Sequence, residues 1–543
     1  MADQPVAKRS RVDDAHGRAA RLVSWLHERG ATMDGLEIRA TPSGLGVFAT
    51  RALAPGQPLG FLPRDAILDP LVELDSDSVA RRALELGSTA PFAFWLSLAC
   101  NSKNESHPFF PYLAALPREA PDPCAWPPAE RELLAGTQLG TQVEAQRRLL
   151  ESEFERIAPK VLSEAGLAGV AFEDLLWARG IHLSRCFPRA MVEAATLVSP
   201  HEILASDQID ASLRVEHGDN RAPRVTWSAS SSNTAAATES VGREEEAASA
   251  DGTEAAVVSE AGVLSKAGDD AASSVPSGAE ANGSGTGAGN DSAAGNLGCM
   301  LPLFDMLEHR CGHPIGWESG GGGVRFRCRV DVEPNAPVYN NYGPKGNQEL
   351  LFTYGFAVDD NSLDAVEGIM VGIPPSDDSK LREAQLKLLT EHEIEHSVRA
   401  DGALLIGPFE AWSGVAAAKQ SASNSVGDGA LDGAADEADA ASETEASGLL
   451  RPELLLALQV IGMEDADDEP ALSLDELDLL RATLSARLNA LLPSEEADSR
   501  APANTRRGFV AAYRRGQRRV LMEALAEVEQ MAEGGEEAED GEN

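Results

Sequence analysis

Three polar side chains follow an apolar run in the stretch LPLFDMLEHR, residues 301–310. Asp305, Glu308 and His309 lie within five positions of one another. Polar groups at the end of a buried strand or turn are costly unless they are paired or in use. We therefore interpret these three residues as candidates for a binding or catalytic site.

A second candidate is the stretch Ser43-Gly44-Leu45-Gly46, which lies between two short extended segments. One interpretation is a tight hairpin turn whose glycines adopt positive φ. The other is a backbone edge that a ligand can approach closely, because glycine has no side chain. The motif is too short to decide between the two by itself.

Arg185 and two tyrosines complete the candidate set. Arg185 in the stretch LSRCF is either an exposed cation with a packed stem or a fork that binds a ligand carboxylate. Tyr342 and Tyr354 each precede a glycine and are twelve residues apart. A tyrosine near a strand end usually packs its ring and leaves its hydroxyl in water. The repeated Tyr-Gly pair nevertheless makes both tyrosines candidates for a site.

A metal site is an alternative for part of this region. His309, Cys311 and His313, with Cys299 nearby, carry zinc-type ligand groups. Their spacing fits no standard zinc module, so we expect core cysteines and a structural histidine instead. The six cysteines contain no Cys-x-x-Cys pair, which argues against a disulfide framework and favours a reducing compartment.

The elements that would position these residues change in character along the chain. Residues 36–63 alternate β-type segments with proline and glycine breaks, which predicts a hairpin-rich sheet. From Pro91 on, apolar residues recur at three-to-four spacing and predict helices, including residues 143–161 and 172–187. The run VRFRCRVDV alternates and predicts a strand, and residues 334–356 predict a strand, a turn and a short helix.

The region after residue 361 is predicted to be mostly helical and to form a separate C-terminal domain. Its apolar periodicity predicts four helices, at residues 379–393, 452–461, 474–492 and 506–531.

Two low-complexity insertions, strongest at residues 228–296 and 413–447, are rich in Ser, Ala, Gly and acidic residues. Such segments cannot bury enough apolar surface to offset their ordering entropy, so we predict that they are disordered. Much of the formal net charge of −41 lies in them and in residues 533–542. This balance argues against nucleic acid as a partner and suits a basic protein segment.

The sequence also gives an expectation for location. No apolar run approaches the length of a membrane helix. Residues 5–14, PVAKRSRVDD, resemble a short nuclear-import signal, although a solvated, disordered N-terminus has the same composition. We expect a protein of the nucleus or the cytoplasm.

Four stretches occur in a recognisable order: SGLGVFA, WARGIHLSR, LPLFDMLEH and NYGPKGNQELLFTYGF. Together they resemble the motifs of the SET-domain methyltransferases of the Rubisco large-subunit methyltransferase class. Those motifs are a Gly-x-Gly turn, a Ser-Arg at a helix end, Asp-x-x-Asn-His and Tyr-Gly-x-x-Ser-Asn-x-Glu-Leu-x-x-x-Tyr-Gly-Phe. The likeness covers most of residues 20–530 except the two insertions, and residues 109–139 resemble the helical insert of that class.

This resemblance implies an α+β protein: a knotted, β-rich SET fold with an inserted helical subdomain, followed by a mostly helical C-terminal domain of the substrate-binding type. The expected domains are a disordered segment 1–19, a SET domain 20–361, a substrate-binding domain 362–532 and an acidic tail 533–543. The expected insertions are a helical one at about 85–200 and disordered ones at about 205–297 and 413–448.

The resemblance also implies S-adenosylmethionine as the cofactor and no metal. Ser43, Gly44, Leu45 and Gly46 would line the cofactor through their backbone groups, and Arg185 would hold its methionine carboxylate.

The remaining motif residues would complete the site. Asp305 would buttress the turn, Glu308 would lie beside the cofactor ammonium, and His309 would meet the adenosine through its backbone. Tyr342 and Tyr354 would shape the channel in which the methyl group is transferred.

The implied activity is methyl transfer to a lysine side chain of a protein. The lysine would reach the cofactor through a narrow channel that enforces in-line attack. The target amine must be neutral to attack, whereas a solvated lysine has a pKa near 10.4. Desolvation and the nearby sulfonium both disfavour the charged amine and lower that pKa. The partner would be a basic protein segment, and the enzyme a monomer.

The sequence departs from the motifs at two positions. Glu308 stands where the class has Asn, and it can accept a hydrogen bond but cannot donate one. Gly346 stands where the class has Ser. Two alternatives therefore stay open: a protein-histidine N-methyltransferase, and a catalytically inactive SET scaffold that binds a protein partner.

Overall fold

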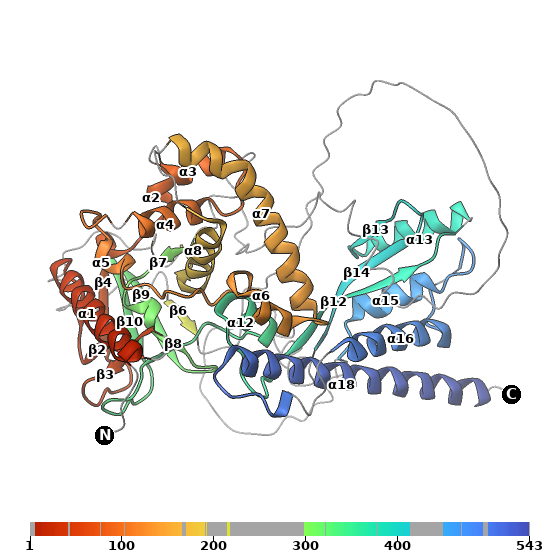
Figure 1. Ribbon diagram of the computed structural model, residues 1–543. Helices are drawn as coiled ribbons and strands as arrows, with labels where there is room; N and C mark the ends of the chain where they lie inside the picture. The colour runs from red at the N-terminus through yellow and green to blue at the C-terminus, as the bar shows by residue number, and fades with distance from the viewer. Residues whose placement is uncertain are drawn as a thin grey trace. The chain divides into compact units, whose positions relative to one another are not determined.

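The computed structural model describes residues 6–41, 44–75, 78–102, 104–164, 170–189, 192, 214–217, 298–320, 322–376, 378–412, 449–468, 470–491 and 498–541. Figure 1 shows their helices and strands, coloured from red at the N-terminus to blue at the C-terminus. Apart from residues 214–217, the two insertions predicted to be disordered lie outside the described residues.

The chain begins with helix α1 (Val6–Glu28), where we predicted disorder over residues 1–19. That prediction is wrong for residues 6–19. Ala15, Ala19, Leu22 and Leu26 recur at three-to-four spacing and are buried, so α1 contributes an apolar face to the core.

A five-stranded antiparallel sheet has the order β1-β4-β10-β9-β6. Its strands are β1 (Thr32–Met33), β4 (Pro58–Pro63), β10 (Gly323–Cys328), β9 (Ile315–Gly320) and β6 (Arg214–His217). The strand predicted from VRFRCRVDV is confirmed over β10, in which Val324, Phe326 and Cys328 are buried. Phe326 packs on Trp317 of β9 with ring centroids 4.8 Å apart.

Three two-stranded pairs bring distant segments together. β2 (Leu36–Thr41) pairs with β3 (Gly44–Ala49), and β5 (Cys186–Phe187) with β7 (Cys299–Met300), both antiparallel. β8 (Glu308–His309) pairs in parallel with β11 (Tyr339–Asn340). Each candidate motif therefore lies on or next to one of these pairs.

The helical segment between β4 and β5, called the insert below for its place between these strands, is made of α2 (Pro70–Asp75), α3 (Val79–Glu85), α4 (Pro91–Asn101), α5 (Phe110–Leu113), α6 (Pro128–Arg131), α7 (Gln138–Glu164) and α8 (Phe172–Arg185). The 3₁₀ turns η1 (Arg64–Ala66), η2 (Pro123–Ala125) and η3 (Glu132–Leu134) join parts of it. Gly180 of α8 lies against Asp122, because a Cβ at Gly180 would lie 2.7 Å from the Cβ of Asp122. This close approach fixes the helix that ends at Arg185.

The region after residue 361 contains the four predicted helices, as α13 (Ser379–Glu391), α15 (Pro452–Ile461), α16 (Leu474–Ala490) and α18 (Arg506–Gly541). α18 continues through most of the predicted acidic tail. The short helix α12 (Asn347–Tyr354) precedes this region and carries one of the candidate tyrosines.

The same region also holds a three-stranded antiparallel sheet that the sequence analysis did not predict. Its order is β12 (Ala365–Ile373), β14 (Leu404–Trp412), β13 (His396–Val398). Glycines interrupt β12, and its pairing with β14 shifts register on either side of Ile369. The alternation that marks a strand is therefore broken in the sequence.

Among the described residues, no helix is both long and apolar enough to cross a membrane.

Candidate functional site

A buried carboxylate joins three parts of the chain at the end of α8. Nη1 of Arg185 donates to Oδ2 of Asp305 at 2.9 Å and to its backbone oxygen at 3.0 Å. The hydroxyl of Tyr112, from α5, donates to the same Oδ2 at 2.8 Å. Asp305 lies in the turn η4 (Phe304–Met306) and is only 8% exposed. The trio ties this turn to α8 and to α5.

The charges of Arg185 and Asp305 each stabilise the charged form of the other against the effect of burial. Burial raises the pKa of Asp305 above its usual value, and the charge of Arg185 opposes that rise. Burial alone would lower the pKa of Arg185, but Asp305 raises it, so the guanidinium stays protonated. The second carboxylate oxygen of Asp305, Oδ1, is buried and accepts no hydrogen bond within the described part of the chain. It is an acceptor available to a ligand.

An aromatic wall follows the trio along the chain. The rings of His309 and Tyr342 lie 4.9 Å apart, and those of Tyr342 and Tyr354 lie 4.6 Å apart, both stacked. Phe356 adds a fourth ring, 5.9 Å from His309 and 6.3 Å from Tyr354. The parallel pairing of β8 with β11 places Tyr342 beside His309, because Asn340 is opposite His309.

Burial sets the protonation of this wall. Burial, with a smaller effect of Lys345, lowers the pKa of His309 to about 4, so the ring is neutral at pH 7. Its Nδ1 accepts from the backbone N–H of Tyr342 at 3.0 Å. Burial raises the pKa of Tyr342 and of Tyr354 well above the usual value, so both phenols keep their protons. A tyrosinate base is thereby excluded at neutral pH.

The two hydroxyl groups differ in their partners. Tyr342 donates to the backbone oxygen of Leu307 at 2.9 Å, which fixes its ring. The hydroxyl of Tyr354 makes no hydrogen bond with any residue that the structure describes. Tyr354 therefore offers a polar group to a bound molecule.

The Gly-x-Gly stretch lies within strand β3 rather than in the turn itself. Gly44 pairs with Thr41 of β2, and the tip of the hairpin, with Ser43, lies outside the described residues. Gly44 has a φ of +140° with open space where a Cβ would lie. Leu45 is buried, and a Cβ on Gly46 would lie 3.1 Å from Thr41. The positive φ favours glycine at position 44, although a Cβ there would meet no other atom.

β3 is connected to the aromatic wall through the chain before β11. The N–H of Val338 donates to the oxygen of Val47 at 2.9 Å, and the N–H of Ala49 donates to the oxygen of Ala336 at 2.9 Å. β3 also contacts η4. The structure thus brings four of the sequence motifs into one neighbourhood.

Glu308 differs from its neighbours because its side chain is exposed. A carboxylate there carries little desolvation cost. It lies close enough to Tyr342 to contribute to the raised pKa of that phenol, after burial and the Arg185–Asp305 pair.

Tyr112, Phe356 and Phe509 were not predicted from the sequence to belong to the site. Phe356 could have been found, since it ends the quoted motif TYGF. Phe509, on α18, meets Phe356 edge-on at 6.4 Å. Nothing local in the sequence marks Tyr112 or Phe509, because their roles depend on contacts with distant residues.

The metal alternative gains no support. Across the residues that the structure describes, no three His, Cys, Asp or Glu side chains gather in a way that could hold a metal ion. Cys311 is exposed, whereas His313 is buried edge-on against Tyr339 at 5.8 Å. All six cysteines are free thiols.

A cavity of about 500 Å³ lies next to the site but is not part of it. Its lining includes Arg310, His313 and Tyr339, which follow or precede the β8–β11 pair, and none of the candidate site residues.

Comparison with known proteins gives the following matches. No family model matches the chain. Ribosomal lysine N-methyltransferase set10 of Schizosaccharomyces pombe is 42% identical over 79 residues, 14% of this chain and 14% of that protein. Ribosomal lysine N-methyltransferase 1 of Saccharomyces cerevisiae is 27% identical over 233 residues, 43% of this chain and 38% of that protein. The chain therefore aligns with less than half the length of each of these curated relatives.

Solved structures cover much more of the chain. The structure of Rubisco LSMT bound to AdoMet aligns with 95% of this chain and 92% of its own, with a TM-score of 0.58 and 14% identity. The SET domain of LSMT bound to lysine and AdoHcy aligns with 95% and 91%, with a TM-score of 0.57 and 15% identity. We conclude that this chain has the α+β SET-domain fold of the Rubisco LSMT structures.

Proposed function

We propose that the chain is an S-adenosylmethionine-dependent protein-lysine N-methyltransferase. The observation that carries this proposal is the meeting of Arg185, Asp305, His309, Tyr342 and Tyr354 on a fold shared with Rubisco LSMT. The names of the two curated relatives, and the lysine bound in one LSMT structure, point to the same acceptor. They also make lysine the preferred acceptor over histidine.

The residues fit the cofactor in charge and in the hydrogen-bonding groups that they leave available. Nε and Nη2 of Arg185 donate no hydrogen bond to any described residue, so both groups can donate to the cofactor carboxylate. The buried, unpartnered Oδ1 of Asp305 suits a cationic group such as the cofactor ammonium. Gly44 offers a backbone edge without a side chain. Ser43, Leu45, Gly46, Glu308 and His309 complete the proposed cofactor contacts.

S-adenosylmethionine, when bound, supplies a methyl group activated by its sulfonium. The residues of the chain act on the acceptor. The buried aromatic wall of Tyr342 and Tyr354 disfavours a charged lysine and so favours the neutral amine that can attack. The uncommitted hydroxyl of Tyr354 can accept a hydrogen bond from this amine and fix the direction of its lone pair.

The finer parts of the proposal concern the rest of the chain. We infer the knotted threading of the SET fold, the helical insert at about 85–200 and a substrate-binding role for residues 362–532. The net charge of −41 would attract a basic segment of the protein substrate. A monomer of the nucleus or cytoplasm fits these features.

An inactive SET scaffold is the second candidate, and Glu308 is the observation that favours it. A carboxylate near the cofactor carboxylate would weaken binding by repulsion. Because Glu308 is exposed, solvent screens this repulsion, and we expect binding to persist.

The test is transfer of labelled methyl groups from S-adenosylmethionine into proteins of a cell extract, with mass spectrometry of the labelled residue. We expect label on lysine. Arg185→Ala should weaken cofactor binding, and Tyr354→Phe should lower the transfer rate by about 100-fold through lost positioning. Tyr339→Phe is the matched control, since its ring lies outside the wall. Equal labelling by all four proteins would refute the assignment of Arg185 and Tyr354.

A further inference from the structure

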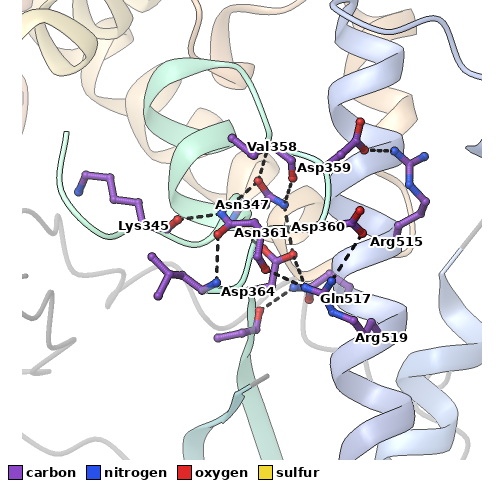
Figure 2. A network of polar contacts seen from close by, with 12 residues as sticks. Lys345, Asn347, Val358, Asp359, Asp360, Asn361, Asp364, Arg515, Gln517 and Arg519 are labelled. Carbon is purple, nitrogen blue, oxygen red and sulfur yellow. Dashed lines mark hydrogen bonds and ion pairs between the residues drawn. The ribbon is translucent and has the colours of Figure 1, made fainter. Parts of the chain in front are cut away.

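A polar network encloses both ends of helix α12, which carries Tyr354 at its last position (Figure 2). Asn347 begins the helix and is 1% exposed. Its amide oxygen accepts from the N–H of Val358 at 2.8 Å, and its amide nitrogen donates to the oxygen of Val358 at 2.9 Å. One side chain thus joins the start of α12 to the chain that leaves its end. The segment between the two contains Tyr354 and Phe356.

A buried carboxylate holds Asn347 in turn. Oδ1 of Asp364 accepts from the backbone N–H of Asn347 at 2.9 Å, and Oδ2 accepts from its side chain at 3.2 Å. Asp364 is 1% exposed. Its negative charge lies at the N-terminus of α12, where it is favourable. The side-chain amide of Asn361 donates to the backbone oxygen of Lys345 at 2.9 Å and so holds the loop that precedes the helix.

The cation that faces Asp364 comes from the C-terminal helix α18. Nη2 of Arg519 lies 3.4 Å from Oδ2 of Asp364 and donates to the oxygen of Asn361 at 2.7 Å (Figure 2). A Cβ on Gly516 would lie 2.0 Å from the same Oδ2, so glycine allows α18 to approach this closely. α18, which begins about 150 residues after α12 ends, thereby completes the network around α12.

Two further contacts join α18 to the same element. The hydroxyl of Tyr513 donates to Oε1 of Gln348, the second residue of α12, at 2.8 Å. Phe509 packs edge-on against Phe356, which itself touches the ring of Tyr354. α18 therefore contacts residues at the start of α12 and just after its end.

We propose that Asp364 and Arg519 are positioning residues: through Asn347 they hold α12 so that Tyr354 faces the reacting groups. This inference rests on the proposed methyl transfer. It gives the C-terminal region a part in the chemical step, in addition to any part in binding substrate. Neither residue touches the aromatic wall, so both act through Asn347.

The test uses the full chain with three variants, Asp364→Asn, Arg519→Met and Arg519→Lys. Arg507→Met is the matched control, because Arg507 is an exposed arginine on the same helix. The measurements are kcat and KM for methyl transfer, and hydrogen exchange of the amides of residues 347–358. The amides of the five-stranded sheet report whether each variant is folded.

We expect kcat to fall about 10-fold in Asp364→Asn and Arg519→Met, with KM changed less than twofold, and exchange at residues 347–358 to accelerate. Arg519→Lys should recover part of the rate, because it keeps the charge, and Arg507→Met should match the wild type. An unchanged kcat in an active wild-type background would overturn the catalytic part of the inference. Unchanged exchange at 347–358, or equal acceleration throughout the C-terminal sheet, would overturn it whether or not the wild type is active. A wild type that transfers no methyl group would instead refute the proposed function.

Discussion

At the scale of single residues, the site depends on one carboxylate with two donors. Asp305 is buried between Arg185 and Tyr112, which come from two different helices of the insert. A buried carboxylate of this kind is tolerated because its charge is paired and its Oδ2 is hydrogen-bonded. The arrangement leaves Oδ1 and part of the guanidinium for a ligand.

Removing the hydroxyl of Tyr112 tests this arrangement. Tyr112→Phe keeps the ring but takes one hydrogen bond from a charged acceptor, so the free energy of unfolding should fall by about 2 kcal/mol. Urea unfolding measures this loss, and calorimetry should show weaker binding of S-adenosylmethionine. Tyr339→Phe, which changes a half-buried tyrosine outside the trio, is the control. If the two variants were equally stable, Tyr112 would not hold the carboxylate.

Glu308→Asn tests the departure from the motif of the Rubisco methyltransferase class that the sequence resembles. Glu308 is exposed, so the free energy of unfolding should change by less than about 0.5 kcal/mol. Removing a negative charge near the cofactor carboxylate should tighten binding of S-adenosylmethionine up to about 10-fold, most strongly at low salt. Calorimetry at two salt concentrations measures this. Weaker binding in the variant would mean that attraction between Glu308 and the cofactor ammonium outweighs the repulsion from the cofactor carboxylate.

At the scale of elements, two short features make the site. The parallel pair β8–β11 places Tyr342 next to His309, and helix α12 places Tyr354 on Tyr342. α12 has only eight residues, too few to be stable in isolation. Its position must therefore come from its ends.

Substitution of Gly355, the C-terminal cap of α12, tests whether the ends of the helix determine its position. Gly355 has a φ of +71°, and a Cβ there would lie 2.4 Å from the oxygen of Pro121. Gly355→Ala should lower the free energy of unfolding by at least about 2 kcal/mol, through strain and the clash together. Gly343→Ala is the control, because φ is +93° but the space is open, so only about 1 kcal/mol is expected. Similar losses in urea unfolding would show that contact with Pro121 does not fix the cap.

At the scale of the whole molecule, the arginines of α18 offset part of the acidic charge of the chain. Arg506 pairs with Glu130 of the helical insert, and Arg515 pairs with Asp359 beyond α12. Arg514 and Arg518 share the buried carboxylate of Asp498. The helix is thus attached by charge to both the insert and the loop after α12.

Stability should depend on pH through buried histidines. Burial lowers the pKa of His182 to about 4, and its Nε2 lies 3.0 Å from the oxygen of Gly298. Between pH 6.5 and 4 the unfolded chain binds a proton here that the folded chain does not. The free energy of unfolding therefore falls as the pH falls through this window, by up to about 3 kcal/mol for His182.

His182→Gln isolates this effect, since it removes the titrating group and can still donate to Gly298. Urea unfolding at pH 7.5 and pH 4.5 should show a smaller loss for the variant than for the wild type. Parallel losses in both proteins would mean that His182 is protonated in the folded state.

The sequence by itself determined the elements whose signal is local. The helices α13, α15 and α16 were predicted because apolar residues recur at helical spacing over ten or more positions. Strand β10 was predicted from its alternation, and Arg185, Asp305, His309, Tyr342 and Tyr354 from their motifs. Elements with interrupted patterns were not predicted. The glycines of β12 break its alternation, so the C-terminal sheet was missed, and the basic start of α1 suggested disorder.

Only the tertiary structure decided which of these residues meet. Arg185 and Asp305 are 120 residues apart in sequence, and Tyr112 and Asp305 are 193 apart. Such pairs leave no local periodicity, because they depend on how whole elements pack. The same holds for Phe509 and Arg519, whose neighbours around α12 come from more than 150 residues away. Residue types suggested the chemistry, and the packing of the core placed the candidate residues together.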